Sequence, residues 1–350
     1  MKSLAKKIRV LIVDDSALVR KLLSDVISSD PGMEVVGTAS NGVEAIKTVP
    51  KVRPDVVTMD IHMPEMDGLS ALEYIMRKNP LPVVMLSALA QKGAASTLKA
   101  LELGAVDFIT KPSHFPSAIR EISEEVILKV RTAAQARKSI MLGRPRKPAR
   151  GGLSAREVTS PEKNLVIIGA SAGGPKALSG IMPLFPEDTP AAVIIVQHMP
   201  GIFTRSFAER LSNNCKLPVK EAEEDDGLTP GRILIAPGGK DLIVSREGQG
   251  EGWVQLMNCR NKGGASPRID TTMITAAEAY GSSSIGVIMT GMGSDGARGI
   301  ERIKTIKGNT IAQSEESCLV FGMPKVAIEG GFIDWVVPLE KIPEKVLELL

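Results

Sequence analysis

Short apolar runs alternate with segments of helical periodicity along the first third of the chain. The first run covers residues 8–13, and the apolar residues after it recur every three to four positions, as in an amphipathic helix. The alternation continues and predicts strands and helices at 34–39, 42–49, 55–59, 68–76, 82–86, 94–103 and 107–109. Five strands that alternate with helices are typical of a parallel, doubly wound sheet of the α/β class.

The second half of the chain begins with the same pattern and then becomes more varied. Apolar runs typical of buried strands occur at 165–168, 192–196, 285–289, 310–312 and 334–337. Shorter runs suggest a mixed or antiparallel edge, at 233–235, 242–244 and 254–257. A closing helix is expected near 345–350. The pattern therefore predicts a second doubly wound α/β domain whose sheet is mainly parallel.

A segment without apolar periodicity separates the two halves. Apolar residues at helical spacing predict the last helix of the first half, from about residue 117 to the late 130s: Ile119, Ile122, Val126, Val130 and Ala133. The sequence GRPRKPARGG follows at 143–152, and its proline, glycine and positive charge favour an extended linker. We expect a first domain at 1–125, a helical extension and flexible linker at 126–162, and a second domain at 163–350.

Composition narrows the range of partners. The 350 residues suit two domains of ordinary size, and 43% of them are hydrophobic, as in soluble globular proteins. A formal charge of +3 and 3% aromatic residues argue against nucleic-acid binding. No apolar stretch reaches the length of a membrane span, and the N-terminus lacks the pattern of a signal peptide. We expect a cytoplasmic protein that is not inserted in a membrane.

Few residues are available for metal, redox or histidine chemistry. Cys215, Cys259 and Cys318 show no paired spacing, which favours free thiols over a disulfide framework or a zinc site. The histidines are His62, His114 and His198, so a mechanism that needs an imidazole base has few candidates.

Polar residues follow the predicted strands of the first domain. Asp14 and Asp15 end the first strand, Asp60 ends the third, Ser87 lies at the end of the fourth, and Lys111 follows the fifth. The carboxyl ends of parallel strands meet at one edge, which is where ligands bind in such sheets. Converging carboxylates repel one another unless a cation relieves them, and hard oxygen ligands suit Mg²⁺. The edge is thus typical of a site for Mg²⁺ and a phosphoryl group.

From about residue 6 to residue 125 the chain resembles the receiver domain of two-component response regulators, through the motifs VDDS, MDIHMPEMDG, LSA and GAVDFITKP. The resemblance implies a flavodoxin-like fold with a five-stranded parallel sheet. It also implies that a histidine kinase phosphorylates Asp60. Mg²⁺ would be held by Asp14, Asp15, Asp60 and the backbone carbonyl of His62.

The same resemblance assigns roles to other residues of this edge. Residues matching Ser87 and Lys111 bind the phosphoryl group in that family, and Phe108 takes the place of the aromatic switch residue. His62 is expected to be a surface loop residue without chemistry of its own. In the unphosphorylated chain, the receiver would cover one edge of the second domain. Aspartyl phosphate at Asp60 would shift Ser87 and Phe108 and uncover that edge.

Three residues with catalytic chemistry follow predicted strands of the second domain. Ser171 lies in the sequence GASAG, which fits the nucleophile-elbow pattern, where small neighbours expose a serine hydroxyl. His198 and Asp295 each follow another apolar run, so a parallel sheet would bring all three to one edge. A serine needs a base to take its proton and a carboxylate to orient that base. The chain order Ser, His, Asp differs from that of the α/β-hydrolases.

A dinucleotide site is a competing interpretation of the same loop. Gly291, Gly293 and Gly296 match the dinucleotide fingerprint, with Glu315 and Glu316 about twenty residues later. The Asp before Gly296 would repel a pyrophosphate there, and the motif comes late in its domain. Both points disfavour nucleotide binding.

From about residue 163 to residue 348 the chain resembles the chemotaxis protein-glutamate methylesterases, through GASAGGP, IIVQHMPGIFTRSFAERL, GMGSDGARG and TIAQSEESCLVFGMP. The resemblance implies hydrolysis of glutamyl methyl esters on the cytoplasmic helices of chemoreceptors, and deamidation of receptor glutamines. Ser171 would be the nucleophile, His198 the base and Asp295 its orienter. Backbone N–H groups at Ala172 and Met292 would form the oxyanion hole, and the esterase reaction would need no cofactor.

Two other functions stay open at this point. The same triad could act on another ester or amide, because the sequence does not show the substrate pocket. The chain could also be a non-enzymatic response regulator that acts by binding, although it lacks a helix-turn-helix signal. Asp241 stands where the family often has a histidine, and Ser314 stands where an acidic residue is common, so the preference among receptor peptides is an open question.

Overall fold

The computed structural model describes residues 6–88, 91–112, 117–136, 140, 164–248, 250–259 and 266–350. Contacts divide the chain into two compact units, Met1–Arg144 and Pro145–Leu350, and each is described by itself. His114 and the predicted linker sequence at 143–152 lie outside the described residues. No helix in the described part of the chain is both long and apolar enough to cross a membrane.

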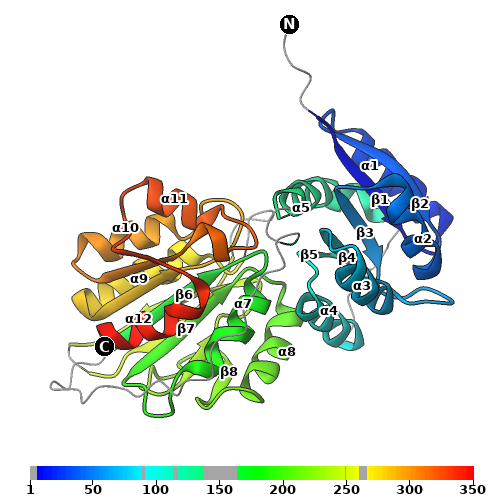
Figure 1. The fold of residues 1–350 in the computed structure, drawn as a ribbon. Coiled ribbons are helices and arrows are strands. Elements are labelled where there is room, and N and C mark those ends of the chain that lie inside the picture. The colour runs from blue at the N-terminus through cyan, green and yellow to red at the C-terminus, as the bar shows by residue number, and fades with distance from the viewer. Residues whose placement is uncertain are drawn as a thin grey trace, which may run out of the picture. The chain divides into compact units, whose positions relative to one another are not determined.

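A five-stranded parallel sheet forms the centre of the first unit, in the order β2-β1-β3-β4-β5. Helices α1 and α5 pack together, and α2, α3 and α4 form a second group (Figure 1). The strands and helices are β1 (Ile8–Val13), α1 (Ala17–Ser28), β2 (Met33–Ala39), α2 (Gly42–Val52), β3 (Val56–Asp60), α3 (Gly68–Lys78), β4 (Val83–Ala88), α4 (Gln91–Leu103), β5 (Asp107–Lys111) and α5 (Ser123–Gln135). The predicted α/β class and parallel sheet are confirmed.

Local sequence explains where these helices begin. Ser16, Asn41 and Asp67 each accept a hydrogen bond from a backbone N–H of the following first turn, which starts α1, α2 and α3. The last helix differs from the prediction, because residues Ser117–Ile122 form a 3-10 helix and the α-helix begins only at Ser123. Strand β3 is buried along its whole length, so its apolar residues form the centre of the core.

A seven-stranded sheet forms the centre of the second unit, in the order β14-β13-β12-β6-β7-β9-β8, and all its pairings are parallel. Figure 1 shows α9, α10 and α11 on one face of this sheet and α7, α8 and α12 on the other. The elements are β6 (Asn164–Ala170), α7 (Gly174–Ile181), β7 (Ala191–Gln197), α8 (Gly201–Ser212), β8 (Val219–Glu221), β9 (Ile233–Ile235), β10 (Lys240–Ser245), β11 (Trp253–Asn258), α9 (Ile269–Tyr280), β12 (Ser284–Ile288), α10 (Ala297–Thr305), β13 (Asn309–Gln313), α11 (Met323–Glu329), β14 (Trp335–Val337) and α12 (Ile342–Leu349).

The expected mixed or antiparallel edge is wrong in detail. Strand β9 is fully buried and pairs in parallel with β7, and the edge strand β8, which the apolar pattern misses, is parallel too. The other two short runs, β10 and β11, leave the main sheet and form a separate antiparallel ribbon. Three residues are too few for period-two alternation to show which sheet a strand joins.

The strand order places a switch point beside β6. From β6 the chain continues to β7 on one side, whereas β12 and β13 lie on the other side. Loops at such a point diverge to opposite faces and leave a crevice at the carboxyl ends of the strands. The loops after β6, β7 and β12 carry Ser171, His198 and Asp295 respectively.

Candidate active site

Ser171 begins the tight turn between β6 and α7. Its backbone N–H donates to the carbonyl of Thr290, 3.0 Å away, which fixes the turn against the end of β12. Gly173 adopts a φ of +78° as the residue before α7, and few side chains tolerate that conformation. A Cβ at Gly291 would lie 2.7 Å from the Cβ of Ser171, which is too close. Position 291 in the neighbouring loop is therefore restricted to glycine. Small residues thus leave the Ser171 side chain partly exposed.

His198 follows β7, and its backbone N–H donates to the carbonyl of Ala170 at 3.1 Å. Its Nε2 atom lies 2.7 Å from Oδ2 of Asp295, and 9% of the side chain is exposed. A carboxylate accepts hydrogen bonds only, so Nε2 carries the proton of this contact. The other ring nitrogen, Nδ1, is therefore the atom of His198 that can accept a proton.

Asp295 is held by the N-terminus of α9 as well as by His198. The backbone N–H groups of Ile269 and Asp270 donate to its Oδ2 and Oδ1 atoms at 2.8 and 2.9 Å. Burial alone would raise the pKa of Asp295, but the hydrogen bonds from His198 and these backbone groups outweigh burial and lower it. The carboxylate therefore stays charged, as the partner of an imidazole must.

Asp270 makes the corresponding contacts with the start of α10, and the sequence did not predict this role. Its Oδ1 atom accepts the backbone N–H groups of Gly296 and Gly299, at 2.9 and 2.8 Å, at the start of α10. Each carboxylate thus caps the helix that begins beside the other carboxylate. Burial and the nearby charge of Asp295 raise the pKa of Asp270. An acidic residue in the first turn of a predicted helix was the available signal.

The same contacts bear on the dinucleotide interpretation. In a dinucleotide site, the backbone N–H groups at the start of the helix point at the pyrophosphate. Here the N–H groups of Gly296 and Gly299 already donate to the carboxylate of Asp270. The start of α10 is occupied by protein and bordered by two carboxylates, which is unfavourable for an anion.

Two further polar side chains tie the loops together. Gln197 Nε2 donates to the carbonyls of Ser171 and His198 at 3.0 and 3.1 Å. Thr290 Oγ1 donates to the carbonyl of Ala172 at 2.9 Å and accepts the N–H of Val320 at 3.0 Å. These contacts fix the backbone around the serine from both neighbouring strands.

The structure also places the two predicted oxyanion donors. Ala172 follows Ser171 directly, and within the described part of the chain its backbone N–H donates no hydrogen bond. Met292 follows Gly291, the position where an added Cβ would lie 2.7 Å from the Cβ of Ser171. Gly291 donates its backbone N–H to the carbonyl of Val320, and Val320 donates its own N–H to Thr290 Oγ1, so the backbone near both residues is anchored to Val320. The N–H of Ala172 is therefore a candidate donor to an oxygen that forms next to Ser171.

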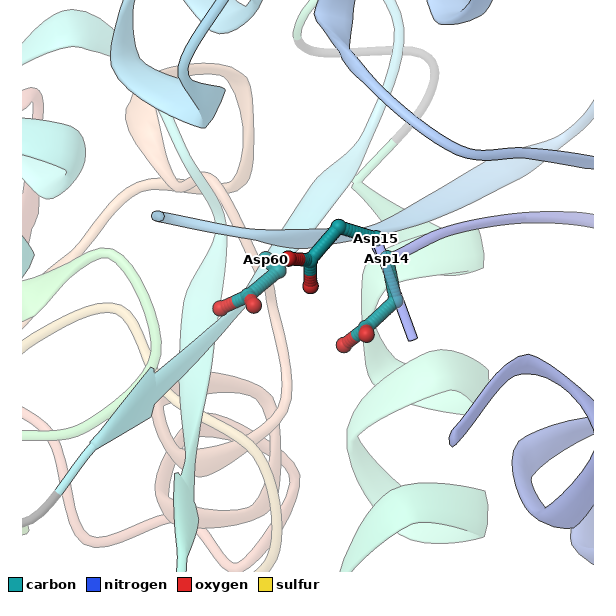
Figure 2. A group of neighbouring side chains, drawn as sticks. All are labelled: Asp14, Asp15 and Asp60. Carbon is teal, nitrogen blue, oxygen red and sulfur yellow. The ribbon is translucent and has the colours of Figure 1, made fainter. Parts of the chain in front are cut away.

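The acidic edge of the first unit lies at the carboxyl ends of β1 and β3. Figure 2 shows the side chains of Asp14, Asp15 and Asp60 gathered beside one another. Their oxygens lie within 4.8 Å of one another, and Asp14 and Asp60 are buried while Asp15 is exposed. Lys111 Nζ lies 3.0 Å from Oδ2 of Asp14 and 2.7 Å from Oδ2 of Asp60. The donor set is all oxygen, which fits a hard divalent cation.

Backbone contacts hold this acidic edge in place. Asp14 Oδ1 accepts the N–H of Ser16 at 3.0 Å, and Arg20 Nη1 donates to the carbonyls of Asp14 and Asp15 at 2.7 and 3.0 Å. The Arg20 contact was not predicted, because an arginine on a helix surface has no sequence signal for it. Burial raises the pKa of Asp14; the Lys111 charge lowers it, but the Asp60 charge raises it further, and the net shift is upward.

The remaining predicted residues of this edge lie at different depths. Ser87 is fully buried, and its Oγ atom lies 2.5 Å from Oγ1 of Thr97 on α4. Phe108 is 3% exposed, and Lys129 Nζ lies 5.0 Å from the centre of its ring. His62 lies on the surface two residues after Asp60. Thus Lys111 contacts the carboxylates, whereas the Ser87 hydroxyl bonds to Thr97.

Comparison with known proteins identifies both units. The model of the CheB methylesterase family matches residues 166–346, and that of the response regulator receiver domain matches residues 10–123. A Pyrococcus abyssi protein, "protein-glutamate methylesterase/protein-glutamine glutaminase", is 50% identical over 98% of this chain and 93% of its own length. The chain belongs to the CheB methylesterase family.

A second full-length relative and a solved catalytic domain agree with this assignment. A Thermotoga maritima protein with the same name is 44% identical over 98% of both chains. The crystal structure of the Thermotoga maritima CheB methylesterase catalytic domain is 44% identical and has a TM-score of 0.52. It covers 54% of this chain and 99% of that domain.

The two departures from the CheB family pattern have different surroundings. Ser314 is 6% exposed, and its hydroxyl bonds to Glu316 Oε1 within its own loop. Asp241 is 2% exposed and accepts hydrogen bonds from Arg268 and from the thiol of Cys259. As the sequence predicts, Cys215, Cys259 and Cys318 are free thiols. Burial raises the pKa of Cys215 to about 11.

Proposed function

We propose that this chain is a phosphorylation-controlled protein-glutamate methylesterase that acts on chemoreceptors in the cytoplasm and also deamidates receptor glutamines. The observation that carries the proposal is the contact between His198 Nε2 and Asp295 at 2.7 Å, on the strand edge that holds Ser171. The names of the relatives supply the substrate class. A receptor-binding regulator without catalysis would need no imidazole held by a carboxylate that three donors fix in place.

The ester reaction follows from the placement of these groups. As the Ser171 oxygen attacks the ester carbonyl, Nδ1 of His198 accepts the serine proton, and the charge of Asp295 stabilises the imidazolium. The oxyanion that forms meets the backbone N–H groups at Ala172 and Met292, each contributing about 3–4 kcal/mol. The bond to methoxide breaks, methanol leaves with the proton from His198, and a glutamyl ester of Ser171 remains.

Hydrolysis of the acyl-enzyme repeats these steps with water. His198 takes a proton from the water, the hydroxide adds to the carbonyl, and the bond to Ser171 breaks as its oxygen regains a proton. The product is a glutamate side chain. A glutamine substrate would follow the same course with ammonia as the leaving group, which explains how one site could serve both activities.

The receiver unit would set the rate of this reaction. We propose that a histidine kinase serves as phosphodonor for Asp60, and that Asp14, Asp15, Asp60 and the carbonyl of His62 hold Mg²⁺ during the transfer. When bound, the ion would neutralise charge on the incoming phosphoryl group. Lys111 already contacts Asp60 and Asp14 and is placed to bind a phosphoryl oxygen. Ser87 would have to leave Thr97 to do the same.

Methanol release from a methylated receptor tests the proposal. The full chain with a small-molecule phosphodonor and Mg²⁺ should release methanol, and Ser171→Ala should reduce the rate by about 10⁴-fold or more. The variant should keep the unfolding midpoint of the parent, because a partly exposed hydroxyl supports no packing. Undiminished release by Ser171→Ala would refute the assignment. Faster hydrolysis of simple esters than of receptors would favour another substrate.

A further inference from the structure

Arg268 lies beside the proposed triad but takes no part in the mechanism above. It directly precedes α9, whose first N–H, that of Ile269, donates to the carboxylate of Asp295 at 2.8 Å. Two residues earlier, the carbonyl of Ser266 accepts the N–H of Met199, the neighbour of His198, at 3.2 Å. The segment that carries Arg268 therefore contacts both loops of the histidine–aspartate pair.

A buried carboxylate holds the Arg268 side chain. Asp241 Oδ2 accepts from Nε of Arg268 at 2.9 Å and also from Nη2, and these two contacts make a forked ion pair. Asp241 Oδ1 accepts from the Arg268 backbone N–H at 3.0 Å and from the Cys259 thiol at 3.3 Å. Asp241 is 2% exposed, so its position is fixed by packing as well as by these donors.

A purely structural role explains only part of this arrangement. The contact between the backbone N–H and Asp241 already anchors the start of α9 without the guanidinium. Yet the side chain of Arg268 is 49% exposed, and within the described part of the chain its Nη1 atom makes no hydrogen bond. An oriented cation thus stands close to the catalytic carboxylate: the contacts with Asp241, and less strongly the charge of Asp295, raise the pKa of Arg268. Its long side chain loses little further entropy on binding, because Asp241 already fixes it.

The charge of this residue indicates what it could bind. A glutamyl methyl ester is neutral, so the reacting group itself offers no anion to a guanidinium. On a helix, side chains three or four residues from the ester lie about 5–6 Å away on the same face. An acidic side chain at such a position is the nearest anion on the substrate helix that a guanidinium beside Asp295 could bind.

We propose that Arg268, oriented by Asp241, is a specificity-determining residue that binds a carboxylate one helical turn from the glutamyl ester in the substrate helix. This inference rests on the proposed function and deepens it. It accounts for the departure at Asp241, because this carboxylate orients the Arg268 side chain. It also makes the activity dependent on neighbouring receptor sites, since every hydrolysed ester becomes a glutamate.

Two helical peptides test the inference, each with one glutamyl methyl ester. One peptide carries Glu four residues before and after the ester, and the other carries Ala at both positions. The full chain with phosphodonor and Mg²⁺ should have a KM lower by roughly fivefold for the acidic peptide, with similar kcat. Arg268→Gln should remove this preference by raising KM for the acidic peptide alone. Arg268→Lys should keep part of it, since the charge remains without the fork.

A matched control separates local charge from general charge. Arg302 on α10 is 44% exposed and pairs with Glu278 at 3.5 Å, so Arg302→Gln removes an equivalent charge elsewhere in the same unit. This variant should retain the preference for the acidic peptide. Raising the salt concentration should weaken the preference of the parent and leave the rate on the Ala peptide unchanged.

Binding to the Ser171→Ala chain decides the inference even if no ester is cleaved. Calorimetry should show the same roughly fivefold difference between the peptides, and Arg268→Gln in that background should abolish it. If Arg268→Gln weakens the binding of both peptides equally, Arg268 has a structural role and the inference is wrong. The inference is also wrong if Arg268→Gln leaves the preference for the acidic peptide unchanged. Failure of the parent chain to release methanol from either peptide would instead overturn the proposed function.

Discussion

The acidic edge of the first unit and the catalytic edge of the second unit have the same architecture but opposite electrostatics. Both lie where parallel strands finish, and both bury an aspartate deeply enough that burial alone would raise its pKa. At the acidic edge, the carboxylate oxygens of Asp14 and Asp60 share the cation of Lys111. At the catalytic edge, Asp295 accepts hydrogen bonds from an imidazole and from two backbone N–H groups.

This difference explains why the pKa shifts have opposite signs. The pKa of Asp14 is raised, because burial and the neighbouring charge of Asp60 outweigh the lysine. The pKa of Asp295 is lowered, because fixed donors outweigh burial. An edge with excess negative charge is suited to a cation and a phosphoryl group, whereas a satisfied carboxylate is suited to hold an imidazole. The number of donors per carboxylate, rather than the depth of burial, distinguishes the two edges.

The largest effect should come from removing the charge of the satisfied carboxylate. Asp295→Asn should lower kcat for methyl-ester hydrolysis by about 10³–10⁴-fold, because a neutral amide neither stabilises the imidazolium nor fixes its tautomer. Steady-state methanol release at saturating receptor measures this. An Asp295→Asn variant that retains a tenth or more of the parent kcat would show that His198 does not depend on Asp295.

The same variant also carries a pH signature. Since the pKa of Asp295 is lowered on folding, its charge stabilises the fold above the ordinary aspartate pKa. That contribution disappears as the pH falls through the lowered value. Asp295→Asn should therefore be less stable than the parent at neutral pH, and urea unfolding should show the difference shrinking in acid.

A change at the acidic edge should remove regulation and leave catalysis. Asp60→Asn should abolish the stimulation of methanol release by a phosphodonor with Mg²⁺, because the amide cannot form the acyl phosphate. The unstimulated rate should stay within about twofold of the parent, since Asp60 belongs to the first unit and the catalytic residues belong to the second. Persisting stimulation in this variant would place the phosphorylated residue elsewhere.

How far the sequence predicts each edge depends on what a pattern can encode. Apolar runs followed by Asp14, Asp60, Ser171 and His198 are visible, because strand ends are marked by a change from apolar to polar residues. Strand pairing then brings those ends together, as β6 pairs with both β7 and β12. The class of fold and the gathering of side chains were therefore predictable.

The supporting contacts were not predictable in the same way. Asp270 caps a helix that begins 27 positions later in the chain, and Arg20 donates to the carbonyls of Asp14 and Asp15. Such contacts depend on side-chain direction and on the packing of helices against each other, which leave no period in the sequence. The isolated β10–β11 ribbon was missed for a related reason, because a short apolar run does not reveal its pairing partner.

The smallest expected effect is a change in stability on replacing Asp14. It gives the most direct comparison of the two edges. A raised pKa means that the folded chain disfavours the charged form, so the stability due to this group is complete in acid and lost as the pH rises past the ordinary aspartate value. With Mg²⁺ removed by a chelator, Asp14→Asn should therefore stabilise the receiver unit at neutral pH, by on the order of 1 kcal/mol. Urea unfolding with a receiver-specific probe measures this.

The sign should reverse when Mg²⁺ is added. The ion would stabilise the parent through Asp14 and its neighbours, whereas the variant has lost one charged ligand and should gain less from the same concentration. Asp14→Asn and Asp295→Asn then shift stability in opposite directions without the metal, although both replace one aspartate at the end of a parallel sheet. Destabilisation by both variants in chelator would mean that Lys111 satisfies Asp14 as fully as the N–H groups satisfy Asp295, and the contrast between the edges would fail.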